Sequence, residues 1–364
     1  MKLRNNSSRN GHLSEEIDHL RKYSLNRNRK FTIEQLNKPV SFWIKKERLL
    51  NEIGKEFTII LRTKGCYWAL EHAGCSMCGY IEDANIDNVN SQQVINQFNY
   101  ALDKKLEEIN SDKCSYVLKI FNSGSFFDDN EISEDIRCHI YKRISIIPNI
   151  KEVTIETRVE FINKNVLKEM QKYLENKYVE LGIGLESVDD YIRNNYINKN
   201  LLFDDFIRVT KLSHEMGIGI KAYLLFKPPF LNEQGAIDDC VHSIKTLLNF
   251  NIDTISINPC NIQKGSLVEY LWNQKRYRPP WFYSLFESFK EALKQEDFER
   301  VRILCDPSGS GSKRGIHNCS SKECNGNMKE ILQNFILNQD LRELDSLDSE
   351  CICKKKYDIQ KYQN

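Results

Sequence analysis

The sequence lacks any long run of hydrophobic residues. No stretch of its 364 residues approaches the ~18 consecutive apolar side chains that a membrane-spanning helix requires. The first twenty residues, MKLRNNSSRNGHLSEEIDHL, contain no apolar core of the kind that marks a secretory signal peptide. These two absences predict a protein of the cytoplasm with no membrane partner.

Glycine and proline are scarce as well, with 16 and 8 residues respectively. That scarcity excludes a collagen-like or low-complexity chain, and 40% hydrophobic with 28% charged residues is an ordinary globular composition. The length suggests two or three domains at ~150 residues each, although an α/β barrel commonly uses ~200 to 250 residues as one domain.

Overall charge is nearly balanced, at a formal +1, but its distribution along the chain is uneven. Residues 1–50 contain twelve Lys or Arg and five Asp or Glu, a net of +7, so the remaining residues carry −6. A basic segment of this kind favours a polyanion such as a nucleic acid, because cations that displace phosphate counterions supply affinity without sequence preference. A solvated basic helix explains the same charges.

Cysteine, by contrast, is abundant, with twelve residues. A disulfide framework is not expected, because cytosolic thiols are kept reduced. Six of the twelve fall in close pairs, which are Cys75/Cys78, Cys319/Cys324 and Cys351/Cys353. Such spacing favours shared metal ions over packing.

Short apolar runs rich in β-branched residues alternate with segments of helical period. The predicted strands are Phe57–Leu61, Tyr116–Phe121, Val153–Glu156, Val179–Gly184, Ile218–Phe226, Thr254–Asn258 and Val301–Leu304. The predicted helices are Gln92–Ile109, Glu134–Ile144, Asn165–Leu174, Asp204–Met216, Ile237–Phe250, Trp281–Leu293 and Met328–Leu337. Strand and helix in alternation predict an α/β fold with a parallel sheet, curled into a full or partial barrel whose chemistry lies at the carboxyl ends of the strands.

Three parts are expected along the chain. Residues 1–50 read as a basic helical extension with a break at Lys38-Pro39, and residues 51–305 as the barrel. The Gly/Ser-rich turn at residues 306–315 marks a boundary, so residues 306–364 form a small cysteine-rich module.

The loop after the first predicted strand contains Cys66, Cys75 and Cys78 with the spacing C-x8-C-x2-C. Three thiolates suit a [4Fe–4S] cluster that leaves one iron free to bind a small molecule. With His72 as a fourth ligand, the same loop would instead hold a structural zinc ion.

This loop resembles the cluster loop of the radical S-adenosylmethionine (SAM) superfamily, in the longer-spaced form of the Elongator catalytic subunit and its relatives. Two features depart from the commonest pattern. The first gap has eight residues where three are usual, and Met77 precedes the last cysteine where an aromatic residue is usual. The resemblance implies a partial (β/α)6-type barrel, a [4Fe–4S] cluster and SAM.

The segments after later strands extend the resemblance. Ser123, Gly124 and Ser125 match the turn that receives the SAM amino group, and Glu156 with Arg158 matches a Glu-Thr-Arg sequence of the Elongator relatives. Glu186 corresponds to a ribose contact, and Lys199, on the next helix, to a contact with the SAM carboxylate. Taken singly, the same residues also fit an ordinary strand-to-helix turn, a salt bridge and a solvated lysine.

The C-terminal module offers five soft ligands, which are His317, Cys319, Cys324, Cys351 and Cys353. Four of them would complete a closed zinc site that stabilises a module with little core of its own. A second Fe–S cluster is the alternative. Lys354, Lys355 and Lys356 next to this site add positive charge suited to a nucleic acid.

The segment from Ser312 to Cys319, SKRGIHNC, and the final C-x-C are similar to the C-terminal pattern of the archaeosine-biosynthesis radical SAM proteins of archaea. That family implies a specific reaction on tRNA. A partner, the lysine-transferring subunit of archaeosine synthase and a relative of tRNA-guanine transglycosylase, attaches lysine to a deazaguanine in the D-loop. The radical enzyme then breaks the lysine carbon–nitrogen bond, with electrons from a separate donor, and leaves the formamidine of archaeosine.

Two other functions fit the residues alone. One is a zinc-stapled tRNA-binding module without redox chemistry, and the other is a radical SAM enzyme that acts on a small molecule. Only the enzymes need Cys66, Cys75 and Cys78 as a set.

Overall fold

A single eight-stranded sheet lies at the centre of the computed structural model, which describes residues 11–25, 31–87, 89–345 and 351–363. The strands follow one another in sequence order and are β1 (Ser41–Arg48), β2 (Ile53–Leu61), β3 (Tyr116–Asn122), β4 (Ile150–Glu156), β5 (Tyr178–Glu186), β6 (Gly219–Phe226), β7 (Thr254–Pro259) and β8 (Arg302–Leu304). Strands β2 to β8 are parallel, and β1 pairs antiparallel with β2.

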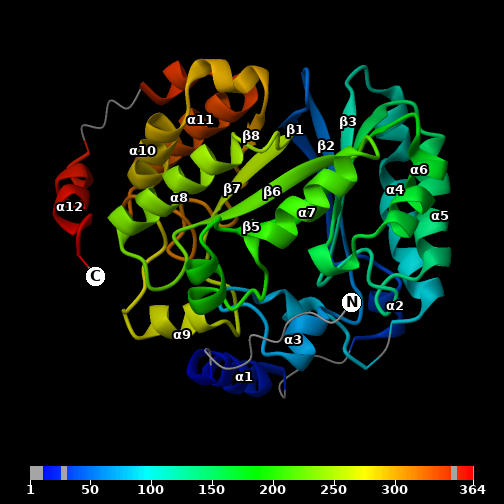
Figure 1. The fold of residues 1–364 in the computed structure, drawn as a ribbon, viewed down its shortest axis with the longest axis horizontal. Coiled ribbons are helices and arrows are strands. Elements are labelled where there is room, and N and C mark those ends of the chain that lie inside the picture. Colours follow the sequence, from blue (N-terminus) through cyan, green and yellow to red (C-terminus); the bar gives the residue numbers. More distant parts are fainter. Residues whose placement is uncertain (1–10, 26–30, 88, 346–350, 364) are drawn as a thin grey trace.

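Helices cover the outer face of this sheet, which curls into an open barrel (Figure 1). In chain order the helices are α1 (Gly11–Leu25), α2 (Ile33–Leu36), α3 (Tyr67–Glu71), α4 (Ser91–Ser111), α5 (Glu134–Ser145), α6 (Lys164–Leu174), α7 (Phe203–His214), α8 (Glu233–Leu247), α9 (Leu267–Asn273), α10 (Phe282–Ala292), α11 (Lys322–Asn338) and α12 (Cys353–Gln360). The predicted partial βα barrel is therefore confirmed. Among the described residues, no helix is long and apolar enough to cross a membrane.

The two faces of the strands differ in chemistry because successive side chains point to opposite sides. On β5, for example, Val179, Leu181 and Ile183 pack into the main apolar core beneath the helices. The intervening Glu180, Gly182 and Gly184 therefore face the inside of the barrel. The interior is thus lined with polar and small residues.

Strand β1 was missed by the sequence analysis, which assigned residues 1–50 to a helical extension. The extension does contain α1 and α2, but the sheet begins at Ser41. The run Lys45-Lys46-Glu47-Arg48 hides the strand because four charged residues in succession do not alternate with apolar ones. The strand tolerates these charges because Lys45 and Glu47 have partners in the barrel interior, while Lys46 is exposed to solvent.

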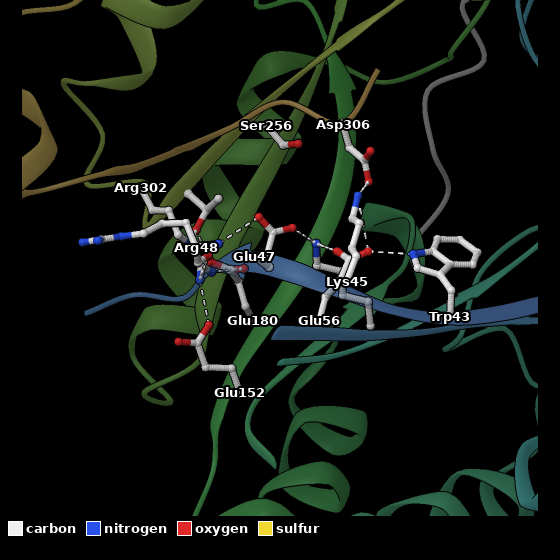
Figure 2. A network of polar contacts seen from close by, with 12 residues as sticks. Trp43, Lys45, Glu47, Arg48, Glu56, Glu152, Glu180, Ser256, Arg302 and Asp306 are labelled. Carbon is white, nitrogen blue, oxygen red and sulfur yellow. Dashed lines mark hydrogen bonds and ion pairs between the residues drawn. The ribbon is translucent and has the colours of Figure 1, made fainter. Parts of the chain in front are cut away.

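Those partners form a buried polar network towards the amino ends of the parallel strands (Figure 2). Lys119 on β3 forms ion pairs with Glu47 of β1, at 2.5 Å, and with Glu56 of β2. Arg302 on β8 pairs with Glu152 at 2.7 Å and with Glu180 at 3.0 Å. The network links six strands at the end of the barrel opposite to the loops that follow the strands.

The C-terminal module packs directly on the barrel. Phe335 of α11 stacks on Phe289 of α10 with ring centroids 5.1 Å apart, and Tyr357 of α12 lies 5.3 Å from Tyr283. Their buried side chains belong to the same apolar core as the outer face of the sheet.

Candidate active site and metal centre

The loop between β2 and α4 places its three cysteines in one packed cluster of side chains at the carboxyl end of the sheet. Cys75 is buried, while Cys66 and Cys78 are partly buried against the same apolar residues, which include Trp68 and Ile17. All three are free thiols. Burial raises the pKa of Cys66, and it raises the pKa of Cys78 to about 12. Three soft donors converging in an apolar shell fit a [4Fe–4S] cluster with one open iron.

His72 does not complete a zinc site in this loop. Its ring is exposed and stacks on Trp68 with centroids 4.8 Å apart. Among the described residues, the ligand atoms that lie close enough together to hold a single metal ion belong to cysteines near the other end of the chain.

Arg21 of α1 contacts the loop between β2 and α4, residues 62–90, which we call the cluster loop. Its guanidinium donates to the carbonyl oxygens of Ala73, Cys75 (3.2 Å) and Cys78 (3.3 Å), and the side chain is only 2% exposed. The pKa of Cys78 is pulled downward by this positive charge, against the larger effect of burial. Arg21 could not be singled out from the sequence, because one arginine among the twelve basic residues of positions 1–50 carries no distinguishing signal.

The turn after β3 contacts the cluster loop closely at Gly124. A Cβ on Gly124 would lie 2.8 Å from the Cα of Cys66 and closer still to the carboxylate of Glu131, so only glycine fits. Glu131 accepts hydrogen bonds from Thr63 (2.6 Å), Asn122 (2.9 Å) and the backbone N–H of Ser125 (2.8 Å). This buried carboxyl, which sequence reasoning also missed, joins the loops after β2 and β3.

Ser123 is buried in the same turn, and the hydroxyl of Ser125 links it to the loop after β4. The Ser125 oxygen lies 2.6 Å from the Thr157 hydroxyl and accepts from the backbone N–H of Arg158 at 3.1 Å. Burial raises the pKa of the neighbouring Glu156 carboxyl to about 7.

Arg158 stands beside the cysteines. Its guanidinium lies 5.6 Å from the Tyr67 ring, pairs with Glu160 at 2.5 Å and donates to the carbonyl of Lys199 at 3.1 Å. Its charge lowers the pKa of Cys66, although burial of the thiol has the larger, opposite effect.

Glu186 and Lys199 form a salt bridge of 2.8 Å at the carboxyl end of β5. Burial opposes the charge of Lys199, but Glu186 raises its pKa on balance. A Cβ on Gly184 would meet both side chains, at 2.5 Å from Nζ and 2.7 Å from Oε1. An unsubstituted backbone at Gly184 is therefore required for the pair to lie across it.

One detail of the prediction was wrong, because Lys199 does not lie on a helix. A π-helical turn, Ile192–Tyr196, ends just before it, and both Asn198 and Asn200 have positive φ, which stops helical propagation. The resulting loop contacts the cluster loop, since the Asn198 amide donates to the Gly74 carbonyl at 2.8 Å.

Beyond β7, residues 258–266 also contact the cluster loop. The Gln263 side chain accepts from the backbone N–H of Gly79 at 2.6 Å. Cys260 is buried, and this burial raises its pKa to about 12.

The second cysteine group is in the C-terminal module. The sulfur atoms of Cys319, Cys324, Cys351 and Cys353 all lie within 4.8 Å of one another. His317, the fifth candidate, is outside this group, and its Nδ1 lies 2.8 Å from the Gly315 carbonyl oxygen. Four thiols in this arrangement fit a closed tetrahedral metal site.

A comparison with solved structures agrees with this geometry. The archaeal Elp3 of Methanocaldococcus infernus superposes with a TM-score of 0.50 and 17% identity, covering 68% of this chain and 59% of that chain. The chain therefore shares the fold of this archaeal Elp3. No family model matches the sequence.

Two curated relatives resemble the chain over most of its length. One is an uncharacterised protein of Methanocaldococcus jannaschii, 42% identical over 90% of this chain and 87% of its own. The other, archaeosine synthase subunit beta of Methanosarcina acetivorans, is 35% identical over 90% of this chain and 92% of its own. The chain belongs to the archaeosine synthase subunit beta family.

Proposed function

We propose that this protein is a radical SAM enzyme of tRNA modification. It would cleave the carbon–nitrogen bond of a lysine adduct on 7-deazaguanosine in the tRNA D-loop and leave the formamidine of archaeosine on the base. The observation that carries the proposal is the combination of family membership with three convergent cysteines at the carboxyl end of a radical SAM barrel.

The residues that would hold the cofactors surround the cluster loop. Cys66, Cys75 and Cys78 would bind a [4Fe–4S] cluster, and the SAM contacts are proposed to be Ser123, Gly124, Ser125, Glu156, Arg158, Glu186 and Lys199. When bound, the cluster and SAM supply a 5′-deoxyadenosyl radical that removes a hydrogen atom from the substrate.

The chain's own residues support this chemistry by charge and position. Lys199 offers an ammonium beside the cluster loop for the SAM carboxylate, and Glu186 keeps it oriented at 2.8 Å. The small turn at Gly124 brings main-chain groups next to Cys66, where the SAM amino group would bind. Trp68 and Ile17 pack in one apolar cluster with the cysteines and reduce the access of water to them.

We further propose that the C-terminal cysteines bind zinc. The four sulfur atoms, from Cys319, from Cys324 in the first turn of α11, and from Cys351 and Cys353 at the start of α12, would be joined by one ion that fixes α12 against α10. The proposed partners are tRNA, the lysine-transferring subunit of archaeosine synthase and an electron donor.

The proposal is tested with protein purified and reconstituted without oxygen. With SAM, a reductant and tRNA bearing the lysine adduct, we expect archaeosine, detected by mass spectrometry of the digested tRNA. A Cys75→Ala variant should abolish SAM cleavage yet retain tRNA binding. An intact cluster that cleaves SAM but produces no formamidine would refute the assignment.

A further inference from the structure

Inward-facing residues of five neighbouring strands form a belt inside the barrel that stays partly accessible. They are Phe121 on β3, Glu156 on β4, Gly184 on β5, Tyr223 on β6 and Asn258 on β7. The residues immediately before each of them on its strand are buried. This belt lies at the carboxyl half of the barrel, directly inward of the cluster loop.

Lys221 lies one inward-facing position below Tyr223 on β6, at the floor of the belt. It is 2% exposed, and in the described part of the chain it has no hydrogen bond or ion pair. Its ammonium instead lies 5.2 Å from the centroid of the Tyr223 ring. Burial, and after it the charge of Lys119, lowers the pKa of Lys221 to about 7.

Four of the nearby carboxylates are already paired, and a fifth, Glu156, has no ion pair among the described residues and a pKa that burial raises to about 7. Glu47 and Glu56 bind Lys119, while Glu152 and Glu180 bind Arg302. A buried ammonium without a carboxylate of its own is costly, and an incoming carboxylate would relieve that cost. Lys221 is therefore a buried ammonium that an incoming carboxylate could pair with.

Tyr223 offers a second donor to the same place. Its hydroxyl is buried and has no hydrogen-bond partner among the described residues. Its ring lies over Gly182 of β5, where a Cβ would be 2.8 Å from the Tyr223 Cε2 atom. The missing side chain at residue 182 is what lets the ring lie across the neighbouring strand.

We propose that Lys221 and Tyr223 form a carboxylate-binding subsite that receives the amino-acid end of the substrate's lysine arm. This inference rests on the function proposed above. Leu225, which packs with the cluster loop, is four residues from Lys221, or about 13 Å along the strand. The five carbon–carbon bonds from the reacting carbon to the carboxylate span about 6 Å. The arm is therefore shorter than the distance along β6 between the level of the cluster loop and Lys221.

The test compares two arms on the same tRNA. One tRNA bears the lysine adduct, and the other bears a pentane-1,5-diamine adduct, which has the same chain without the carboxylate. The wild type should prefer the lysine arm by at least about 30-fold in kcat/KM, the loss expected when a buried charge pair lacks one partner. Lys221→Met should lower turnover of the lysine arm by a similar factor and lose the preference, while Tyr223→Phe should reduce it several-fold.

Two measurements guard against misfolding. SAM cleavage without tRNA should be unchanged in Lys221→Met, and the exposed-lysine variant Lys211→Met on α7 should behave as the wild type in every assay. Binding of Nε-acetyl-lysine and of N-acetyl-pentane-1,5-diamine to the whole protein is measured alongside by calorimetry.

The outcomes separate the subsite from the reaction. If neither tRNA is turned over but Nε-acetyl-lysine binds only when Lys221 is present, the subsite stands and the proposed function falls. If Lys221→Met still prefers the lysine arm as strongly as the wild type does, the subsite is refuted while the function stands. Failure of both turnover and Lys221-dependent binding refutes both.

Discussion

Among single residues, Arg21 has the most concentrated set of contacts with the candidate site. One buried guanidinium satisfies three carbonyl oxygens of a loop that lies more than fifty residues away in sequence. These carbonyls belong to Ala73 and to two of the three cysteines of this loop, Cys75 and Cys78, so the arginine fixes the backbone from which the thiols project.

Replacing Arg21 by glutamine should therefore weaken both the fold and the cluster. We expect the free energy of unfolding to fall by about 2 to 4 kcal/mol, because charge-assisted hydrogen bonds are lost and buried carbonyls remain unpaired. Iron content after reconstitution should fall at least twofold. Denaturant unfolding and iron analysis measure the two effects, with the neighbouring exposed variant Lys22→Gln as control. Full iron loading in Arg21→Gln would contradict this role.

Asp239 on α8 gives a prediction for pH. It accepts a hydrogen bond from Ser187 at 2.6 Å, and burial raises its pKa to about 7. The folded protein therefore holds this proton up to about pH 7, whereas an unfolded chain releases it near pH 4. Because the folded state binds more protons in this interval, this carboxyl's stabilising contribution declines as pH rises from about 4 to 7.

An Asp239→Asn variant has no proton to lose and should be less sensitive to pH. Relative to the wild type, its free energy of unfolding should gain on the order of 2 kcal/mol between pH 5 and pH 7.5. Urea titrations at both pH values measure this difference. Asp238→Asn, an exposed neighbour on the same helix, should leave the pH dependence unchanged, and an equal effect in both variants would argue against Asp239.

Some residues of the candidate site could be predicted from the sequence, and others could not. Cys66, Cys75 and Cys78 could be predicted because their spacing is unusual and cysteine has few other reasons to cluster. Arg21 and Glu131 could not, because their roles depend on tertiary contacts with segments distant in sequence. The position of Lys199 was predicted, but its loop conformation depends on two positive φ angles that no spacing rule reveals.

At the level of elements, β1 depends on the interior of the barrel for its stability. Its residues Lys45 and Glu47 find partners on other strands, and Trp43 donates to Glu56 at 2.8 Å. The parallel strands could be predicted because they are short apolar runs rich in β-branched residues. Strand β1 could not, because its inward face carries Lys45 and Glu47.

Lys119→Met tests this dependence. The change leaves Glu47 and Glu56 without their shared partner, and we expect a loss of about 3 to 5 kcal/mol in the free energy of unfolding, the usual cost of an unpaired buried charge. The double variant Lys119→Met with Glu47→Gln should recover part of the loss. Guanidinium titration provides the measurement, and a single variant as stable as wild type would show that the network is dispensable.

The four cysteines of the C-terminal module give a second prediction, which concerns helix α12. Cys324→Ser, or treatment with a zinc chelator, should release α12 from α10 and lower Tm by several degrees, because metal binding contributes directly to folding. Metal analysis and thermal unfolding follow the change. Cys138→Ser, a partly buried thiol on α5, serves as control, and an unchanged metal content in Cys324→Ser would remove this residue from the site.

For the whole molecule, the distribution of exposed charge predicts how tRNA binds. On α12, Lys354 is occupied by an ion pair with Asp358 and lies over the Tyr357 ring, whereas Lys355 and Lys356 are exposed. These two remain available for phosphates. Their replacement by glutamate should weaken tRNA binding and reduce the slope of log K against log salt by about one to two, since each phosphate contact contributes slightly less than one.

The matching control for this prediction is SAM cleavage without tRNA, which should be unaffected by the two substitutions. Binding measured at several salt concentrations gives the slope. An unchanged slope would move the tRNA surface away from α12.

The order of strands adds a final property. Pairing runs unbroken from β1 to β8, and the two ends are joined by side chains, where Arg302 donates to the carbonyl of Arg48 at 3.3 Å and Lys45 pairs with Asp306 at 2.7 Å. At this boundary between β1 and β8, called the seam, the two strands can therefore separate without breaking any hydrogen bond between neighbouring strands. In deuterium exchange, the amides of β1 that face the seam should label long before those of β5, which is flanked by strands on both sides.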